Sequence, residues 1–249
     1  MFFQPMKKIL FILTIMFSGL FGCALASPPP KGALIYCSYS RTGAAGLGKD
    51  YCELITDTDS VPKVVVALNV GNRFEDPEIH ATFEVDSAVV DSLRQKLHDA
   101  KVHELAGYSL EESITGGHSY RIYMEYASGE KINARWYGSK VKDSAVRAYN
   151  LIENYFRPWR EKAESQARID NIVLMEECYD RVQAAVKSRK AYPTIEEDVE
   201  ALRRYMYSGQ WQRDYEADER GEIPSDLKRG VLSQDGLYDL LEGGRIPKP

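Results

Sequence analysis

The spacing of apolar residues changes once along the chain, and this change constrains the fold more than any other feature. From Lys31 to about residue 160, short β-like runs alternate with two helical stretches, and in some of these runs apolar and polar residues alternate as in half-exposed strands. From Ala163 onward apolar residues recur every three or four positions, which is typical of amphipathic helices. The hydrophobic share of 44% over 249 residues is sufficient for a core in each part. The sequence therefore predicts an α+β domain at residues 32–160 and an all-α domain at residues 163–249.

The first domain is expected to be an antiparallel sheet with its helices on one face. A series of β-like runs is followed by a helix that begins near Asp86. Two further runs, at residues 120–126 and 131–137, form a second hairpin, and a helix that begins near Asp143 follows it. Pro158 is expected to end this helix, because proline removes a helical hydrogen bond. We therefore expect two hairpin-plus-helix units that share one sheet.

The second domain is expected to be a small helical module. Pro193 separates two helical stripes, and Thr194 with Glu197 has the spacing of a capping box for the second stripe. Ser233 can cap a final short helix that ends at Gly243. The stripes can bury one another, so the module is expected to form a core of its own.

A cationic start followed by a short apolar run predicts that the chain is exported. Residues 6–8 are Met-Lys-Lys, and the following run, residues 9–21, consists mostly of Ile, Leu, Phe and Met. A membrane-spanning helix needs roughly 20 residues, so this run fits the core of a signal peptide better. We expect residues 1–26 to be a signal peptide and residues 27–31 a proline-rich spacer. The mature protein would then reside in the periplasm, the cell envelope or the extracellular space.

Two processing sites fit the end of this segment. Residues 20–23 resemble a bacterial lipobox, which would place a lipid anchor on Cys23. Residues 24–26, Ala-Leu-Ala, resemble the site of the ordinary signal peptidase. Membrane attachment is expected only in the first case, and both cases stay open at this point.

Cys37 and Cys52 lie in two β-rich runs that flank a glycine-rich turn. In a hairpin that places them opposite each other they could form a disulfide, since an exported protein folds in an oxidising compartment. The alternative is two small buried thiols on the core face, because disulfide geometry is demanding. Cys178 has no partner in either case.

The sequence contains no complete catalytic or metal-binding motif. The four histidines are scattered, no serine occupies a nucleophile elbow, and no Cys/His spacing of a zinc site occurs. The net charge of −5 gives no basic footprint for nucleic acid. We therefore expect neither a metal nor a cofactor, and no nucleic acid among the partners.

Two functions from different classes are compatible with these features. The first is a non-catalytic envelope protein whose β-rich domain binds a partner protein or a glycan, with its many tyrosines as a recognition surface. The alternative is a hydrolase of envelope material that uses the acid and base groups around His80 or the acids of the helical domain. A pocket shared by distant groups would favour the hydrolase, and a flat tyrosine-rich sheet face would favour binding. The candidate binding residues are Arg41, Glu78, His80, Arg121 and Arg135.

Two parts of the chain resemble known families. Residues 168–244, above all 211–219 and 224–238, look like the bacterial domain of unknown function 4298. That resemblance implies a small helical domain without assigned chemistry. The first domain loosely resembles uncharacterised secreted bacterial domains that share a Tyr-Ser-x-x-Gly start, here residues 39–43. The same domains share a Tyr- and Gly-containing strand pair, here residues 117–134, and the resemblance implies no activity.

We predict that the mature chain in its natural host begins at Ser27 or at a diacylglyceryl Cys23. The physical reason is the apolar run after Lys7 and Lys8, which the export machinery recognises. Mass spectrometry of the purified native protein checks this. An intact terminus at Met1 or Met6 in a cytoplasmic fraction would contradict it.

Overall fold

A computed structural model describes residues 28–43, 49–56, 60–69, 78–112, 116–243 and 245–248. These residues form two compact units. The first unit contains the described residues up to Asn69 and residues Thr82–Phe156. The second contains the chain from Arg157 onward, together with the start of strand β4 through Ala81. The processing sites expected at Cys23 and Ala26 lie outside the described residues.

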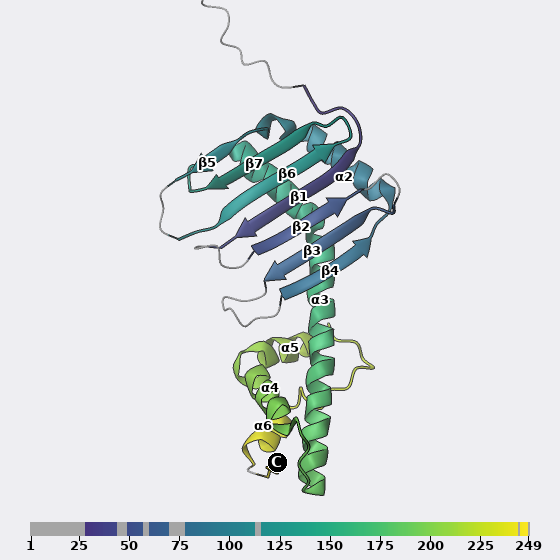
Figure 1. Cartoon of the computed structure of the whole chain (residues 1–249), viewed down its shortest axis with the longest axis vertical. Helices are drawn as coiled ribbons and strands as arrows, with labels where there is room; N and C mark the ends of the chain where they lie inside the picture. Colours follow the sequence, from purple (N-terminus) through teal and green to yellow (C-terminus); the bar gives the residue numbers. More distant parts are fainter. Residues whose placement is uncertain are drawn as a thin grey trace, which may run out of the picture. The chain divides into compact units, whose positions relative to one another are not determined.

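Seven strands form one sheet in the order β4-β3-β2-β1-β6-β7-β5 (Figure 1). Strand β1 pairs with β2 on one side and with β6 on the other, both antiparallel, so that it joins the two expected hairpins. Strand β5 pairs with β7 in parallel and extends the sheet at one edge. The strands are β1 (Leu34–Thr42), β2 (Lys49–Ile55), β3 (Lys63–Asn69), β4 (Glu78–Glu84), β5 (Ser109–Glu111), β6 (Ser119–Tyr126) and β7 (Lys131–Tyr137).

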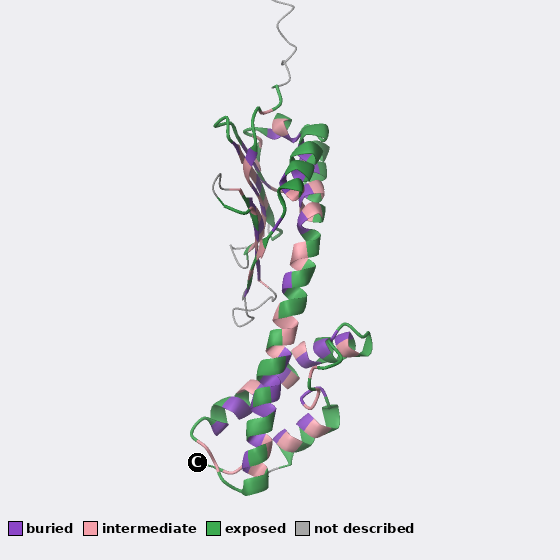
Figure 2. Cartoon of the chain, turned by 90° about the vertical axis from the view of Figure 1, so that its right-hand side faces the viewer, coloured by how far each residue is buried: buried purple, intermediate pink, exposed green. Residues whose placement is uncertain are grey.

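Helices of the first unit cover one face of this sheet (Figure 2). They are α2 (Ser87–Asp99) and the N-terminal part of α3 (Asp143–Ser188). On the covered face the ring of Tyr149 from α3 lies edge-on against Tyr39, Tyr120 and Trp136 at centroid distances of 5.4, 5.0 and 5.9 Å. Asp86 caps α2 by accepting a hydrogen bond from the amide of Ala88. The predicted class, an antiparallel sheet with helices on one face, is confirmed, and the short edge strand β5 is the parallel addition to it.

The second unit is a helical domain with its own core. Three short helices, α4 (Ile195–Tyr207), α5 (Gln210–Glu219) and α6 (Gln234–Glu242), belong to it together with the rest of α3. Ser233 caps α6 as expected, accepting from the amide of Gly236 at 3.3 Å. The core is built from seventeen buried residues: Ile172, Met175, Cys178, Tyr179, Val182, Ala185, Ile195, Val199, Leu202, Tyr205, Trp211, Ala217, Ile223, Val231, Leu232, Leu237 and Leu241.

Two expectations about helix ends were wrong. Helix α3 does not stop at Pro158 but continues through it to Ser188. A proline inside a helix costs ~3 kcal/mol, and burial of Phe156 before it and Ala163 after it offsets this cost. The capping box at Thr194 is also absent, because its side chain makes no cap hydrogen bond. The carbonyl of Tyr192 instead accepts the first amide of α4, from Ile195 at 3.2 Å.

We predict that a fragment from Ala163 to Pro249 folds alone, because its buried cluster contains no residue before Ile172. Circular dichroism should show a helical spectrum and a cooperative thermal transition. A fragment that is unfolded under conditions in which the full chain is folded would mean that the core needs residues before Ala163.

Candidate functional site

The sheet face opposite the helices of the first unit carries polar and aromatic side chains on its central strands. Successive side chains of a strand point to opposite faces. On β7 the residues Ile132, Ala134 and Trp136 are buried, so the residues between them point outward. We call the outward surface the open face. It is made by Tyr36, Ser38 and Ser40 of β1, Lys49, Tyr51, Glu53 and Ile55 of β2, Arg121, Tyr123 and Glu125 of β6, and Lys131, Asn133, Arg135 and Tyr137 of β7.

Two arginines lie directly opposite each other on the open face. Arg121 of β6 and Arg135 of β7 are register partners, and both are exposed. Arg121 Nε donates to Asn133 Oδ1 at 3.0 Å, and Arg135 Nε donates to Ser109 Oγ at 3.2 Å. Within the described part of the chain neither guanidinium has a carboxylate partner. Like charges placed directly across two strands destabilise a sheet.

Tyrosines of the open face are held in place by neighbouring acids. Tyr36 Oη donates to Glu53 Oε1 at 2.6 Å, and Tyr123 Oη donates to Glu125 Oε2 at 3.2 Å. Glu125 also pairs with Lys131 at 2.6 Å, and the hydrogen bond from Lys131 lowers the pKa of this carboxyl. The rings of Tyr36 and Tyr123 touch edge to face at a centroid distance of 5.7 Å. The acids on these strands are thereby engaged by neighbours.

Two shallow hollows lie side by side on the open face. One, of about 310 Å³, is lined by tyrosines and glutamates that include Tyr36, Tyr51 and Tyr123. The other, of about 370 Å³, is lined by Arg121, Arg135 and Tyr137, with Glu111 as its carboxylate. Both are also lined by Ser40, Lys49 and Arg121, so they adjoin. An elongated ligand can therefore contact the tyrosines and the arginines together.

Of the four candidate binding residues whose side chains the structure describes, Arg121 and Arg135 lie together. Arg121 and Arg135 share a hollow, whereas Arg41 points to the helix-covered side, where it pairs with Asp50 at 2.9 Å. His80 is exposed on β4, which three strands separate from β6 in the sheet order. The side chain of Glu78 lies outside what the structure describes. His80 is not among the residues that line the hollow shared by Arg121 and Arg135.

The expected cross-strand register of the two cysteines is corrected by two residues. Cys37 lies opposite Leu54, and Cys52 lies opposite Tyr39. Neither cysteine is in a disulfide, and both lie on the covered face with no exposed surface. Burial raises the pKa of Cys37 to about 12, so this thiol stays protonated. The structure therefore contains the alternative, two small buried core residues. In this register each cysteine faces a large buried side chain, Leu54 or Tyr39, and not the other cysteine.

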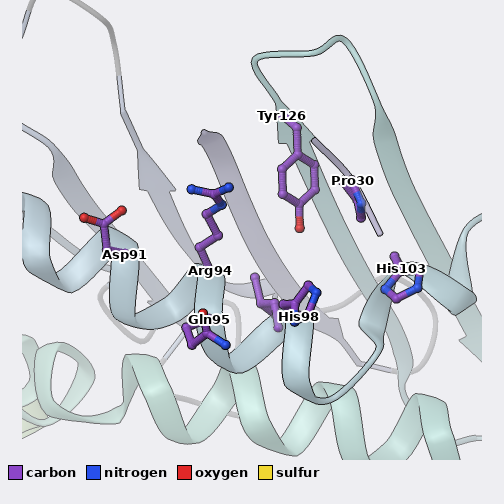
Figure 3. A pocket seen from close by; sticks show the side chains of 8 residues that line it. Pro30, Asp91, Arg94, Gln95, His98, His103 and Tyr126 are labelled. Carbon is purple, nitrogen blue, oxygen red and sulfur yellow. The ribbon is translucent and has the colours of Figure 1, made fainter. Parts of the chain in front are cut away.

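Another group of titratable side chains converges at the end of α2 (Figure 3). They line a hollow of about 450 Å³ between α2, η2 (Val102–Leu105) and the end of β6. His103 Nδ1 is buried there without a hydrogen-bond partner among the described residues. Burial raises the pKa of Tyr126 to about 12, and its hydroxyl contacts Met124 Sδ only at 4.0 Å. The lining residues are Pro30, Asp91, Arg94, Gln95, Leu97, His98, His103 and Tyr126.

Sequence reasoning did not identify this hollow or Lys49, Tyr36 and Tyr51 as site residues. The alternation of apolar and polar residues in β1 and β2 could have placed Tyr36 and Tyr51 on the outward face, since each lies two positions from another outward residue. His98 and His103 are five apart across a helix end, and only the turn at Lys101 brings them to one hollow. Lys101 adopts a left-handed conformation with φ of 52°, which no sequence pattern indicates.

Acids of the helical domain are used in separate structural contacts and do not converge. Asp214 accepts a hydrogen bond from Tyr205 at 2.9 Å, and burial raises its pKa. Asp218 pairs with Arg229 at 2.8 Å, whose guanidinium also donates to loop carbonyls of residues 223–227. Asp226 is exposed. Because these groups hold separate elements, they form no shared charged site.

Asp198 is the buried acid with the largest number of donors around it. Arg181 donates to both carboxylate oxygens at 2.7 and 2.9 Å, and Tyr192 Oη donates at 2.6 Å. The hydrogen bonds from Arg181 lower the pKa of Asp198 to about 2. This folded-state value is below the ordinary value near 3.9, so the ionised carboxylate stabilises the fold above that pH. The contribution is lost as the pH falls through about 2.

We predict that Asp198→Asn lowers the free energy of unfolding by about 2 kcal/mol at pH 7, because it removes charged hydrogen bonds at a buried position. Denaturant unfolding of the full chain, followed by circular dichroism, should show this loss shrinking between about pH 4 and pH 2. Asp239→Asn, at an exposed position of α6, is the control. An Asp198→Asn effect that is independent of pH would contradict the assignment.

Comparisons with known proteins concern the helical domain. Residues 172–245 match the family described as Domain of unknown function (DUF4298), a span that reaches from within α3 to just beyond α6. No curated protein matches the chain. Among the residues that the structure describes, no helix is both long and apolar enough to cross a membrane. In the same residues no group of three or more His, Cys, Asp and Glu could hold a metal ion. The resemblance seen in the sequence from Arg168 to Gly244 is thereby supported as a match to a family without assigned chemistry.

Proposed function

We propose that this chain is an exported, non-catalytic protein of the cell envelope whose open face binds a glycan. The observation that carries the proposal is the combination of tyrosine rings and short polar side chains across the two adjoining hollows. Sugars offer C–H faces that pack on aromatic rings and hydroxyls that exchange hydrogen bonds with polar groups. Export is supported by the sequence of residues 1–26.

A glycan suits this surface better than a protein partner. The outward residues of β6 and β7 include no aliphatic side chain. Stable protein interfaces have an apolar core, which this part of the open face does not offer. Serines, asparagine and tyrosine hydroxyls are instead spread over the surface, which matches the dense hydroxyls of a sugar chain.

The tyrosines are already fixed for binding. Glu53 holds Tyr36, Glu125 holds Tyr123, and the guanidinium of Arg121 lies 5.4 Å from the ring centroid of Tyr123. A side chain that is ordered before binding loses little conformational entropy when a ligand arrives. A shallow open face can therefore retain a polymer through several modest contacts along its length.

The hydrolase remains the second candidate, and one observation favours it. Asp91, His98 and His103 line the same hollow, and a carboxylate with imidazoles can act as general acid and base. This hollow lies at the end of α2 and shares no lining residue with the two hollows of the open face. A hydrolase built on this site would act on the same envelope material, so that cleavage and binding can be measured in one assay.

We predict that the mature protein co-sediments with insoluble bacterial peptidoglycan sacculi or with insoluble xylan. Tyr51→Ala and Tyr123→Ala should each weaken binding about 5-fold, because an aromatic contact contributes ~1 kcal/mol. Tyr238→Ala is the matched control, since this tyrosine is 51% exposed on α6 of the helical domain.

The same assay separates the two candidate functions. Retention without release of soluble sugar supports binding, and equal retention of the wild type and both open-face variants would refute the open-face site. Absence of retention on every polymer would refute the proposal as a whole. Release of reducing sugar that His103→Gln abolishes would establish the hydrolase instead.

A further inference from the structure

The hollow around Arg121 and Arg135 has an excess of positive charge. Lys49, Arg121 and Arg135 line it, and Glu111 is its carboxylate. Among the described residues none of the three cations forms an ion pair. The whole chain is acidic, with 37 acids against 32 bases, so this excess is a local feature. A surface that gathers cations in an acidic protein is complementary to an anion.

The cross-strand arginine pair has a repulsion that a bound anion would offset. Partners directly opposite in a sheet repel when they carry the same charge. Elsewhere on the open face the sheet neutralises its charges, as Lys131 does with Glu125. We infer that the open face binds glycans carrying an isolated carboxylate or phosphate group, which Arg121 and Arg135 hold between them. This inference rests on the proposed glycan binding and names the class of glycan.

The orientation of the two guanidinium groups suits this role. Each uses its Nε to donate to a neutral oxygen of a neighbouring strand, Asn133 Oδ1 or Ser109 Oγ. These hydrogen bonds fix each side chain and leave its two Nη groups for a ligand. Paired Nη donors match the two oxygens of a carboxylate or phosphate. Lys49, which lies over the ring of Tyr51 at 4.9 Å, adds a third cation at the junction of the hollows.

Acids on the same face indicate that the ligand has widely spaced charges. Glu53 and Glu125 balance Lys49 and Arg121 in the lining of the neighbouring hollow, so a second anionic group finds no excess of positive charge there. A nucleic acid carries a charge on every unit, so most of its charges would lie where the surface has no excess of positive charge. A sugar chain with one anionic unit places its charge at the arginines and its neutral units over Tyr36 and Tyr123. The observations therefore favour the glycan.

Matched oligosaccharides test the inference on the full mature chain. The probes are neutral xylotetraose, the same oligosaccharide bearing one glucuronic acid, and an oligosaccharide bearing one phosphodiester. Calorimetry at low salt should show the charged probes binding about 10-fold more tightly than the neutral one, a preference that added salt reduces. The two charged probes distinguish a carboxylate from a phosphate as the preferred group. A single-stranded RNA oligonucleotide is included as the competing polymer.

Arginine variants supply the specific test. Arg121→Gln and Arg135→Gln should each remove most of the preference while binding to the neutral probe persists. Arg147→Gln makes the same charge change at an exposed position of α3 and should have no effect. Arg135→Glu should abolish binding of the charged probes and raise the melting temperature, because it replaces like charges by an ion pair with Arg121. A purely structural arginine pair would instead lose stability in this variant.

Each outcome bears on one of the two proposals. Equal affinity for charged and neutral probes, or a preference unchanged in both glutamine variants, would overturn the inference and leave glycan binding in place. Tighter binding of the RNA than of the charged oligosaccharides would also overturn it. Binding of no probe, together with no retention on insoluble polymers, would overturn glycan binding itself.

Discussion

The antiparallel pairing of β1 with β6 is the contact on which the first unit depends. It joins Leu34–Thr42 to Ser119–Tyr126, which are distant in sequence, and converts two hairpins into one sheet. The register places Tyr39 opposite Ile122 on the covered face and Ser40 opposite Arg121 on the open face. Because side chains alternate, a shift of one residue would exchange these faces along the whole strand. Burial of Tyr39 and Ile122 therefore fixes the position of the proposed ligand-binding surface.

Charge is used differently in the two units. In the helical domain the buried acids Glu176, Asp198 and Asp214 are each satisfied by nearby donors. Glu176 accepts the amides of Gly230 and Val231, and so ties the loop before α6 to α3. Such contacts are costly to break, because an uncompensated buried charge remains. In the first unit, among the residues that the structure describes, Arg121 and Arg135 have only neutral hydrogen-bond partners. This contrast supports a structural role for the first set and a binding role for the second.

The charged and aromatic side chains of the helical domain discussed above serve its structure, and no functional site is assigned to this domain. Its match to a domain of unknown function covers residues 172–245, and residues within this span have structural contacts. Trp211 donates from Nε1 to the carbonyl of Val231 at 3.0 Å. Arg229 donates both to the carboxylate of Asp218 on α5 and to the carbonyl of Pro224 in the following loop. These contacts stabilise the loop between α5 and α6, where regular backbone hydrogen bonding is interrupted.

The sequence by itself determined the class of each unit, because hydrophobic periodicity is a local property that burial requires. Alternation predicted the sheet, three- and four-residue spacing predicted the helical domain, and Asp86 and Ser233 predicted helix starts. Local signals failed where tertiary packing outweighed them, as at Pro158 inside α3. Arg121 and Arg135 were among the candidates, yet their alignment follows from the β6–β7 register, and the separation of His80 from them follows from the strand order. Only the tertiary structure decided which side chains share a surface, because strand register and order depend on burial summed over the whole sheet.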